Sequence, residues 1–273
     1  MRESLIHVNS KNEVLDFNEL GILVNYNEMH DYEWSYSSEN NIITKFEKGI
    51  VKKTIPFVFW CNEQQAIDIK NMFYDHFDVD VLNMSKGYFQ IGDYKYYCYI
   101  TKSKKSNYLI SKRYLEVSIE LTTDEPEWIK ESYYALVKYD VEQETSIKKY
   151  RYAYPFVYAN RKGNIQAVNE SPTACDFLLR IYGACTNPFV KIGQNVYQVN
   201  VSLNNDEYLE IDTKSRTIFS ISHYGNKKNL FHYRSHSRSD FFEKIPFGSN
   251  KVTWNGEFKA ELILYQSRGE PKW

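Results

Sequence analysis

The chain has 273 residues and a net charge of −1, with 34 Lys and Arg against 35 Asp and Glu. That length suits one large domain or two ordinary ones, and either can bury a core without disulfides or metals. The balanced charge excludes the concentrated basic face on which nucleic-acid binding depends. No stretch approaches ~18 uninterrupted apolar residues, and the N-terminus lacks an apolar signal-peptide core, so we expect neither a membrane span nor secretion.

Aromatic residues are abundant, with 24 Tyr, 16 Phe and 5 Trp, and such residues favour pleated, half-buried strands. The four cysteines share no C-x-x-C spacing, which indicates reduced thiols in a protein folded in the cytosol. A bridge between Cys175 and Cys185 is not required but stays open. The cysteines are Cys61, Cys98, Cys175 and Cys185.

Turn-forming residues at Asn9–Asn12 separate Leu5–Val8 from Glu13–Phe17, which predicts an opening hairpin. Gly21–Val24 is a short apolar run that we expect to form a buried strand. Tyr32, Trp34 and Tyr36 alternate with polar residues, a period-two pattern typical of a strand.

The most apolar run of the first half is Lys48–Trp60, which Pro56 interrupts. Because proline has no N–H for a ladder, this strand should lie at a sheet edge or start after Pro56. A helix is predicted at Asn62–Phe77, because Asn62 and Gln65 form a capping box. An apolar stripe should dock this helix on a sheet; it comprises Ala66, Ile69, Phe73 and Phe77.

Further strands are predicted on both sides of a polar segment. Lys102–Lys105 is interpreted as a solvated basic loop. The most polar segment, Asp140–Lys149, is where we place a domain boundary, giving domains 1–140 and 141–273. The predicted strands are Tyr88–Ile91, Tyr94–Thr101, Tyr114–Thr122, Phe177–Tyr182, Phe189–Ile192, Val196–Leu203, Asn229–Arg234, Val252–Trp254 and Phe258–Tyr265.

Two turns in the second half carry the clearest local signals. Asp212–Arg216 separates two β-rich arms within Glu207–Ile221, which predicts a hairpin. Asn255-Gly256 readily adopts positive φ, so we expect a tight antiparallel reversal there. Many short strands with one helix predict a mainly-β protein whose second half is an antiparallel sandwich.

Candidate metal ligands are few and poorly spaced. His232 and His236 are four apart, with His223 nearby, but they lie in a predicted strand and loop, where that spacing does not converge on a metal. Asp75, Asp78 and Asp80 lack the glycine and distal glutamate of a calcium loop.

Catalytic signals are also weak. Glu125 and Glu127 flank Pro126 in an exposed turn, where solvation is the simpler explanation. The chain has no G-x-S-x-G, G-x-G-x-x-G or Walker motif, although spacing alone leaves a serine triad open. We therefore expect no catalytic residues, metal or cofactor.

A sugar-binding alternative rests on Trp254, which could stack on a sugar face and precedes Glu257 by three residues. Galectins resemble this in part, but their upstream His-x-Asn-x-Arg pattern is replaced here by His232-Tyr-Arg234. The turn at Asn255-Gly256 would also carry Glu257 away from the tryptophan.

The order of several turn-and-strand motifs resembles the distal tail (Dit) proteins of siphophages and phage-tail-like particles of Gram-positive bacteria. The resemblance covers nearly the whole chain. Its motifs are NSKNEVLDF, Tyr32–Ser35, the capped helix, Gly87–Lys105, Thr122–Glu131, Ile181–Pro188, EYLEIDTKSRTI, KIPFGSNKVTW and Arg268–Trp273.

The resemblance implies a ring-forming N-terminal β-sandwich with the helix, and a C-terminal galectin-like β-sandwich. It implies a homohexameric ring that joins the tail tube to the tail-tip or tail-associated lysin protein, with receptor-binding proteins on some relatives. The chain would then be a structural, non-enzymatic virion tail protein made in the bacterial cytoplasm, with no nucleic-acid or membrane partner. The alternative function is a carbohydrate-binding module that recognises host cell-wall polysaccharide.

Overall fold

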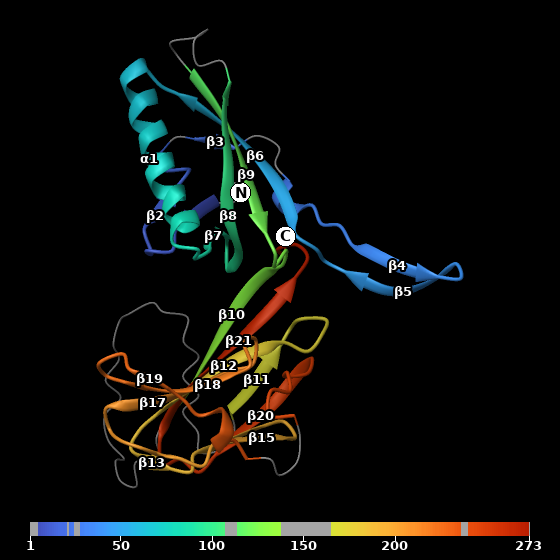
Figure 1. The fold of residues 1–273 in the computed structure, drawn as a ribbon, viewed down its shortest axis with the longest axis vertical. Coiled ribbons are helices and arrows are strands. Elements are labelled where there is room, and N and C mark those ends of the chain that lie inside the picture. Colours follow the sequence, from blue (N-terminus) through green and yellow to red (C-terminus); the bar gives the residue numbers. More distant parts are fainter. Residues whose placement is uncertain are drawn as a thin grey trace. The chain divides into compact units, whose positions relative to one another are not determined.

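The structure is a computed structural model that describes residues 5–20, 22–24, 28–106, 114–137, 165–235 and 240–272. Its contacts divide the chain into two compact units (Figure 1). Unit 1 comprises Met1–Lys130 and Ser267–Trp273, and unit 2 comprises Glu131–Gln266. The segment Asp140–Lys149, where the sequence predicts a boundary, lies outside the described residues.

Unit 1 combines antiparallel strands with one α-helix. Strands β2, β1, β7 and β8 are hydrogen-bonded in that order, and β8 also pairs with β9, which pairs with β6. The elements are β1 (Leu5–Val8), β2 (Val14–Asp16), β3 (Leu23–Val24), the 3-10 helix η1 (Glu28–His30), β4 (Ser35–Glu39), β5 (Ile42–Glu47), β6 (Val51–Trp60), α1 (Glu63–Leu82), β7 (Gly87–Ile91), β8 (Tyr94–Ser106) and β9 (Tyr114–Thr123). Strand β10 (Trp128–Leu136) begins in unit 1 and continues into unit 2.

Strict period-two burial builds the core of unit 1. Every second residue of β9 is buried, and β6 shows the same alternation from Lys53 to Phe59. Phe57 stacks on Phe17, with 4.7 Å between ring centroids, and Phe73 of α1 packs edge-on against Phe57. The helix therefore closes the core with the apolar stripe that the sequence predicts.

Helix α1 begins where the sequence predicts and ends later. The Asn62 side chain accepts a hydrogen bond from the Gln65 N–H, and the Gln65 side chain accepts one from the Asn62 N–H, which confirms the capping box. The predicted end at Phe77 is wrong, because the helix continues to Leu82. Asp80 is buried in the added turn, and its carboxylate accepts a 2.6 Å hydrogen bond from the Ser10 N–H.

Two strand predictions in unit 1 need correction. Lys102–Lys105 is part of strand β8 and not a loop. The alternating segment Tyr32–Tyr36 enters strand β4 only at Ser35. Of the two alternatives for β6, a start after Pro56 is wrong, because the strand runs through Pro56. At Pro56 the strand pairs with β9 on one side, and on the other side no described strand pairs with this residue, as expected at a sheet edge.

Unit 2 is a two-layer sandwich. One layer has the order β19-β18-β17-β12-β21-β10, and the other has the order β11-β20-β14-β15. Its elements are β11 (Ile165–Asn169), β12 (Asp176–Tyr182), β13 (Cys185–Thr186), β14 (Phe189–Ile192), β15 (Asn195–Gln198), β16 (Ser202–Leu203), β17 (Glu207–Asp212), β18 (Thr217–Ser222), β19 (Lys227–Asn229), the 3-10 helix η2 (Phe231–Tyr233), β20 (Gly248–Trp254) and β21 (Lys259–Arg268).

The core of unit 2 lies between its two layers. Phe177 of β12 meets Tyr197 of β15 with ring centroids 4.9 Å apart, and both side chains are almost completely buried. Alternate residues of β17 and β18 point into the same core, which confirms the predicted hairpin. Its turn is held by Asp212, whose side chain accepts a hydrogen bond from the Lys214 N–H.

Three predictions in unit 2 are wrong. Asn255-Gly256 does not close a hairpin, because β20 belongs to one layer and β21 to the other. The predicted strand Val196–Leu203 is two strands, β15 and β16. The predicted strand Asn229–Arg234 is the end of β19 followed by η2.

Candidate interaction surfaces

One exposed apolar surface in unit 1 is a two-stranded arm formed by β4 and β5. Asn40 and Asn41 both have positive φ, so the two strands reverse through the tight turn that asparagine tolerates. All described residues of both strands are exposed. Figure 1 shows the arm leading away from β6, on the side of unit 1 opposite α1.

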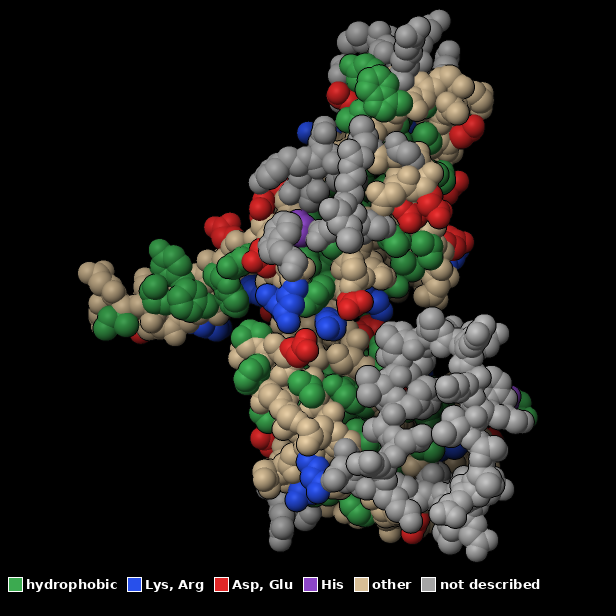
Figure 2. All heavy atoms as spheres, turned by 180° about the vertical axis from the view of Figure 1, so that it is seen from behind, with side chains coloured by type: hydrophobic (Ala, Val, Ile, Leu, Met, Phe, Trp, Pro, Cys, Tyr) green, Lys and Arg blue, Asp and Glu red, His purple; other side chains and the backbone are tan. Residues whose placement is uncertain are grey.

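Large apolar side chains cover this arm, as Figure 2 shows. Ile42 is 68% exposed at the tip, and Tyr36 and Phe46 are paired across the strands. Contacts of Lys48 hold the base of the arm in place. The Lys48 ammonium lies 4.3 Å from the centre of the Trp34 ring and 2.8 Å from the Glu127 carboxylate. An isolated two-stranded hairpin is only marginally stable in water, and clustered exposed apolar groups mark interaction sites.

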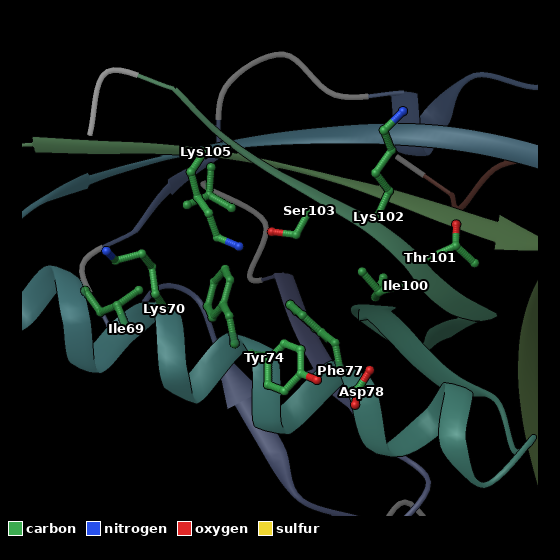
Figure 3. Close-up of a pocket in the computed structure, with 12 residues that line it drawn as sticks. Ile69, Lys70, Tyr74, Phe77, Asp78, Ile100, Thr101, Lys102, Ser103 and Lys105 are labelled. Atoms are coloured by element: carbon green, nitrogen blue, oxygen red, sulfur yellow. The ribbon is translucent and has the colours of Figure 1, made fainter. Parts of the chain in front are cut away.

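A cleft between α1 and β8 is the second surface. It holds about 290 Å³ and has an apolar floor formed in part by Phe73, Phe77 and Ile100. Figure 3 shows Lys105 reaching from β8 toward the helix, whereas Lys102 points away from it. Lys70 of α1 also lines the cleft, so cationic groups come from both of its walls.

The third feature of unit 1 is a buried cluster of polar side chains. His7 Nδ1 lies 2.9 Å from His76 Nε2, and His7 Nε2 lies 4.0 Å from Asp80 Oδ2. The His7 ring packs edge-on against Phe77 and Phe89. Burial lowers the pKa of His7 well below its usual range, assisted by His76, and burial also lowers the pKa of His76. The hydrogen bond between the two imidazoles joins β1 to α1.

The predicted metal ligands do not converge in the part of the chain that is described. Asp80 is buried against Ser10, Asp75 is exposed, and His232 lies in η2. His236 falls outside the described residues. Within the described ranges, no group of three His, Cys, Asp or Glu is placed to hold a metal ion.

The two candidate carboxylates, Glu125 and Glu127, each lie beside a lysine, and the four cysteines form no disulfide. Glu127 pairs with Lys48, and Glu125 lies 3.5 Å from Lys86. All four cysteines are free thiols. Burial raises the pKa of Cys175 to about 12 and that of Cys185 to about 11, so both thiols stay protonated at neutral pH, the opposite of nucleophile activation.

Trp254 lies at the end of β20 and is 8% exposed, as part of the unit 2 core. Glu257 accepts a 2.8 Å hydrogen bond from the Asn255 side chain. A sugar would need the indole face, which the core covers in this structure. The stacking role of Trp254 stays a prediction.

Neither the arm nor the cleft is among the features predicted from the sequence. The Asn40-Asn41 pair between two alternating segments is a hairpin signal that could have revealed the arm. The cleft had no local signal, because its walls come from α1 and β8. Within the described residues, no helix is both long and apolar enough to cross a membrane.

Comparisons with known proteins find similarity in structure only. No protein-family model and no curated protein matches the sequence. The crystal structure of the phage SPP1 Dit (gp 19.1) protein, described as a paradigm of the hub adsorption apparatus in phages that infect Gram-positive bacteria, matches with a TM-score of 0.60 and 7% identity, over 98% of this chain and 100% of that chain.

Two structures of the phage P2 baseplate in its activated conformation also match. The structure with Ca has a TM-score of 0.58 and the structure with Sr a TM-score of 0.59, both at 13% identity and over 99% of this chain and 100% of that chain. These full-length matches confirm the predicted mainly-β architecture with a single α-helix. The chain therefore has the fold of the Dit hub protein and of a phage baseplate component.

Proposed function

We propose that this chain is a structural hub protein of a phage tail baseplate. The observation that carries the proposal is coverage, because the match to a Dit hub protein extends over 98% of this chain and all of the other. A fold can host several functions, but agreement over two units joined in the same order is more specific than a match to one sandwich.

In this role the chain forms a homohexameric ring at the end of the tail tube. The ring joins the tube to the tail-tip or tail-associated lysin protein and to the adsorption apparatus, including a receptor-binding protein. Unit 1 supplies the ring, and the C-terminal sandwich, which we expect to be galectin-like, faces outward. The chain is assembled in the bacterial cytoplasm and acts in the virion tail or a tail-like particle without catalysing a reaction.

The exposed apolar arm supports an assembly role, since a ring subunit must present surface to its neighbours. Stable interfaces typically bury about 1,200–2,000 Å² in total, and a head-to-tail contact closes into a ring when its rotation closes. The near-zero net charge offers little repulsion between copies.

Electron microscopy of the purified chain, alone and mixed with a tail tube protein, tests this function. We expect rings at least in the mixture, and the mass of each ring should be a multiple of the mass of one chain. A chain that stays monomeric in both samples would contradict the proposal. A glycan array tests the carbohydrate-binding alternative. Specific binding by the wild type that is lost in a folded Trp254→Ala variant would support it.

A further inference from the structure

The tip of the arm carries an apolar pair next to an acid. Ile42 and Ile43 follow the Asn40-Asn41 turn, and both are large exposed apolar side chains. Glu39 lies directly opposite Ile42 across the hairpin. The tip therefore presents two branched apolar side chains and one carboxylate at the end of a narrow projection (Figures 1 and 2).

The cleft has the complementary chemistry. Its floor is made of side chains that are already at least nine-tenths buried, so an inserted apolar group would meet packed rings instead of water. Lys70 and Lys105 stand on opposite walls, and among the described residues that line the cleft Asp78 is the only acidic one. A cavity of about 290 Å³ can take the aliphatic side chains of the tip but not a folded element.

The arm cannot fill the cleft of its own chain. Within unit 1 the arm leaves from the β6 side, whereas the cleft opens between α1 and β8 (Figure 1). One copy thus carries the projection on one side and the recess on another. Contacts of this kind are heterologous, and repeating them produces a closed ring or an open filament.

We propose that the tip of the arm of one copy inserts into the α1–β8 cleft of a second copy. Because successive strand residues face opposite sides, one of the two isoleucines packs on Phe73 and Phe77 of α1 and the other on Ile100 of β8, while the Glu39 carboxylate lies between the ammonium groups of Lys70 and Lys105. The inference deepens the proposed function, because it rests on that function's ring and names the contact that links neighbouring subunits. The pairing buries the exposed apolar groups and matches the charge of the tip to that of the recess.

The test uses two interface variants of the full chain and two matched controls. The tip variant is Ile42→Ser with Ile43→Ser, and the cleft variant is Lys70→Glu with Lys105→Glu. Val14→Ser removes an equally exposed apolar group elsewhere in unit 1, and Lys104→Glu changes the charge of a residue beside Lys105 that does not line the cleft. Circular dichroism checks that every variant is folded.

Sedimentation velocity over a concentration series measures association of the chain without other proteins. We expect both interface variants to weaken self-association at least about tenfold, which corresponds to about 1.4 kcal/mol, while both controls match the wild type. A mixture of the tip and cleft variants should form a one-to-one pair and nothing larger, because each retains one half of the contact. A chain carrying both Glu39→Lys and Lys105→Glu should recover association that either change alone weakens.

The possible results separate this inference from the proposed function. Equal association by the wild type and all variants, or a wild type that never self-associates at its highest soluble concentration, overturns the docking of the tip in the cleft. Rings seen with the tail tube protein would still support the hub function in those cases. Association that only the tip variant loses would also overturn the inference, since it would place the tip against another surface.

Discussion

At the scale of single residues, the buried group around His7 shows how polar side chains are accommodated in an aromatic core. The imidazoles of His7 and His76 share one hydrogen bond at 2.9 Å, and Asp80 is held by the Ser10 N–H. A buried polar group costs free energy unless it is paired. The cluster therefore joins β1 to the last turns of α1 only while both histidines are neutral.

The first prediction is a pH dependence of stability. The folded-state pKa of both histidines is lowered, chiefly by burial, although Asp80 and Glu13 act in the opposite direction on His76. The unfolded chain takes up protons near about pH 6.5, so the free energy of unfolding decreases as the pH falls below that value. The expected decrease is about 1.4 kcal/mol per pH unit for each histidine that stays neutral.

Urea unfolding of the wild type and of His7→Phe between pH 7.5 and pH 5 measures this effect. Phenylalanine fits among the same rings but does not titrate, so the variant should show a shallower decrease. An identical pH dependence in both proteins would show that His7 is not one of the groups responsible.

The second prediction concerns Gly87, the first residue of β7. A Cβ atom there would collide with the Asp80 carboxylate and would lie 2.8 Å from the Val8 carbonyl oxygen. Overpacking of this kind typically costs about 1–3 kcal/mol, so Gly87→Ala should lower the free energy of unfolding by that amount. Gly49→Ala is the control, because a Cβ at Gly49 meets no atom within 4 Å. Equal stability of the two variants in urea would refute the close packing at Gly87.

At the scale of elements, α1 depends on its ends as well as on its apolar stripe. The capping box at Asn62 pairs backbone N–H groups that the helix itself leaves without partners. The opposite end closes with a local cap, in which Met84 has a positive φ and the Ser85 N–H donates a 3.0 Å hydrogen bond to the Asp80 carbonyl oxygen.

The third prediction follows from that cap. Asn62→Ala removes the acceptor for the Gln65 N–H and should destabilise unit 1 by about 1 kcal/mol. Asn71→Ala is the control, since Asn71 is exposed within the helix and alanine is the better helix former. Thermal unfolding followed by circular dichroism measures both, and a loss as large in the control would argue against the cap.

At the scale of the whole molecule, the buried apolar residues form two separate cores. One cluster contains residues of unit 1 such as Phe57 and Phe89, and the other contains residues of unit 2 such as Phe177 and Trp254. Units with their own cores can unfold independently.

The fourth prediction is therefore two calorimetric transitions with separate sensitivities. Gly87→Ala should lower the midpoint of one transition, and Trp254→Ala, which removes a buried ring at a cost of about 3–5 kcal/mol, should lower the other. A single transition that both substitutions shift equally would show that the cores unfold as one cooperative unit.

The sequence by itself determined the features that depend on neighbours along the chain. The capping box at Asn62, the opening hairpin and the hairpin around Asp212–Arg216 were all predicted, because side chains a few residues apart produce them. The strand predicted at Tyr114–Thr122 is β9, and one face of that strand is buried along its whole length. The order of these local motifs was enough to indicate the overall fold.

Only the tertiary structure decided which strands share a sheet and where elements end. Asn255-Gly256 has the local chemistry of a hairpin, yet the flanking strands belong to different layers because each finds its partners far away in the chain. Lys102–Lys105 is polar enough for a loop, but each of these four residues pairs with a residue of β9, which extends the ladder through the segment. The α1–β8 cleft and the His7–His76 pair arise from residues tens of positions apart, and the local pattern carries no information about such contacts.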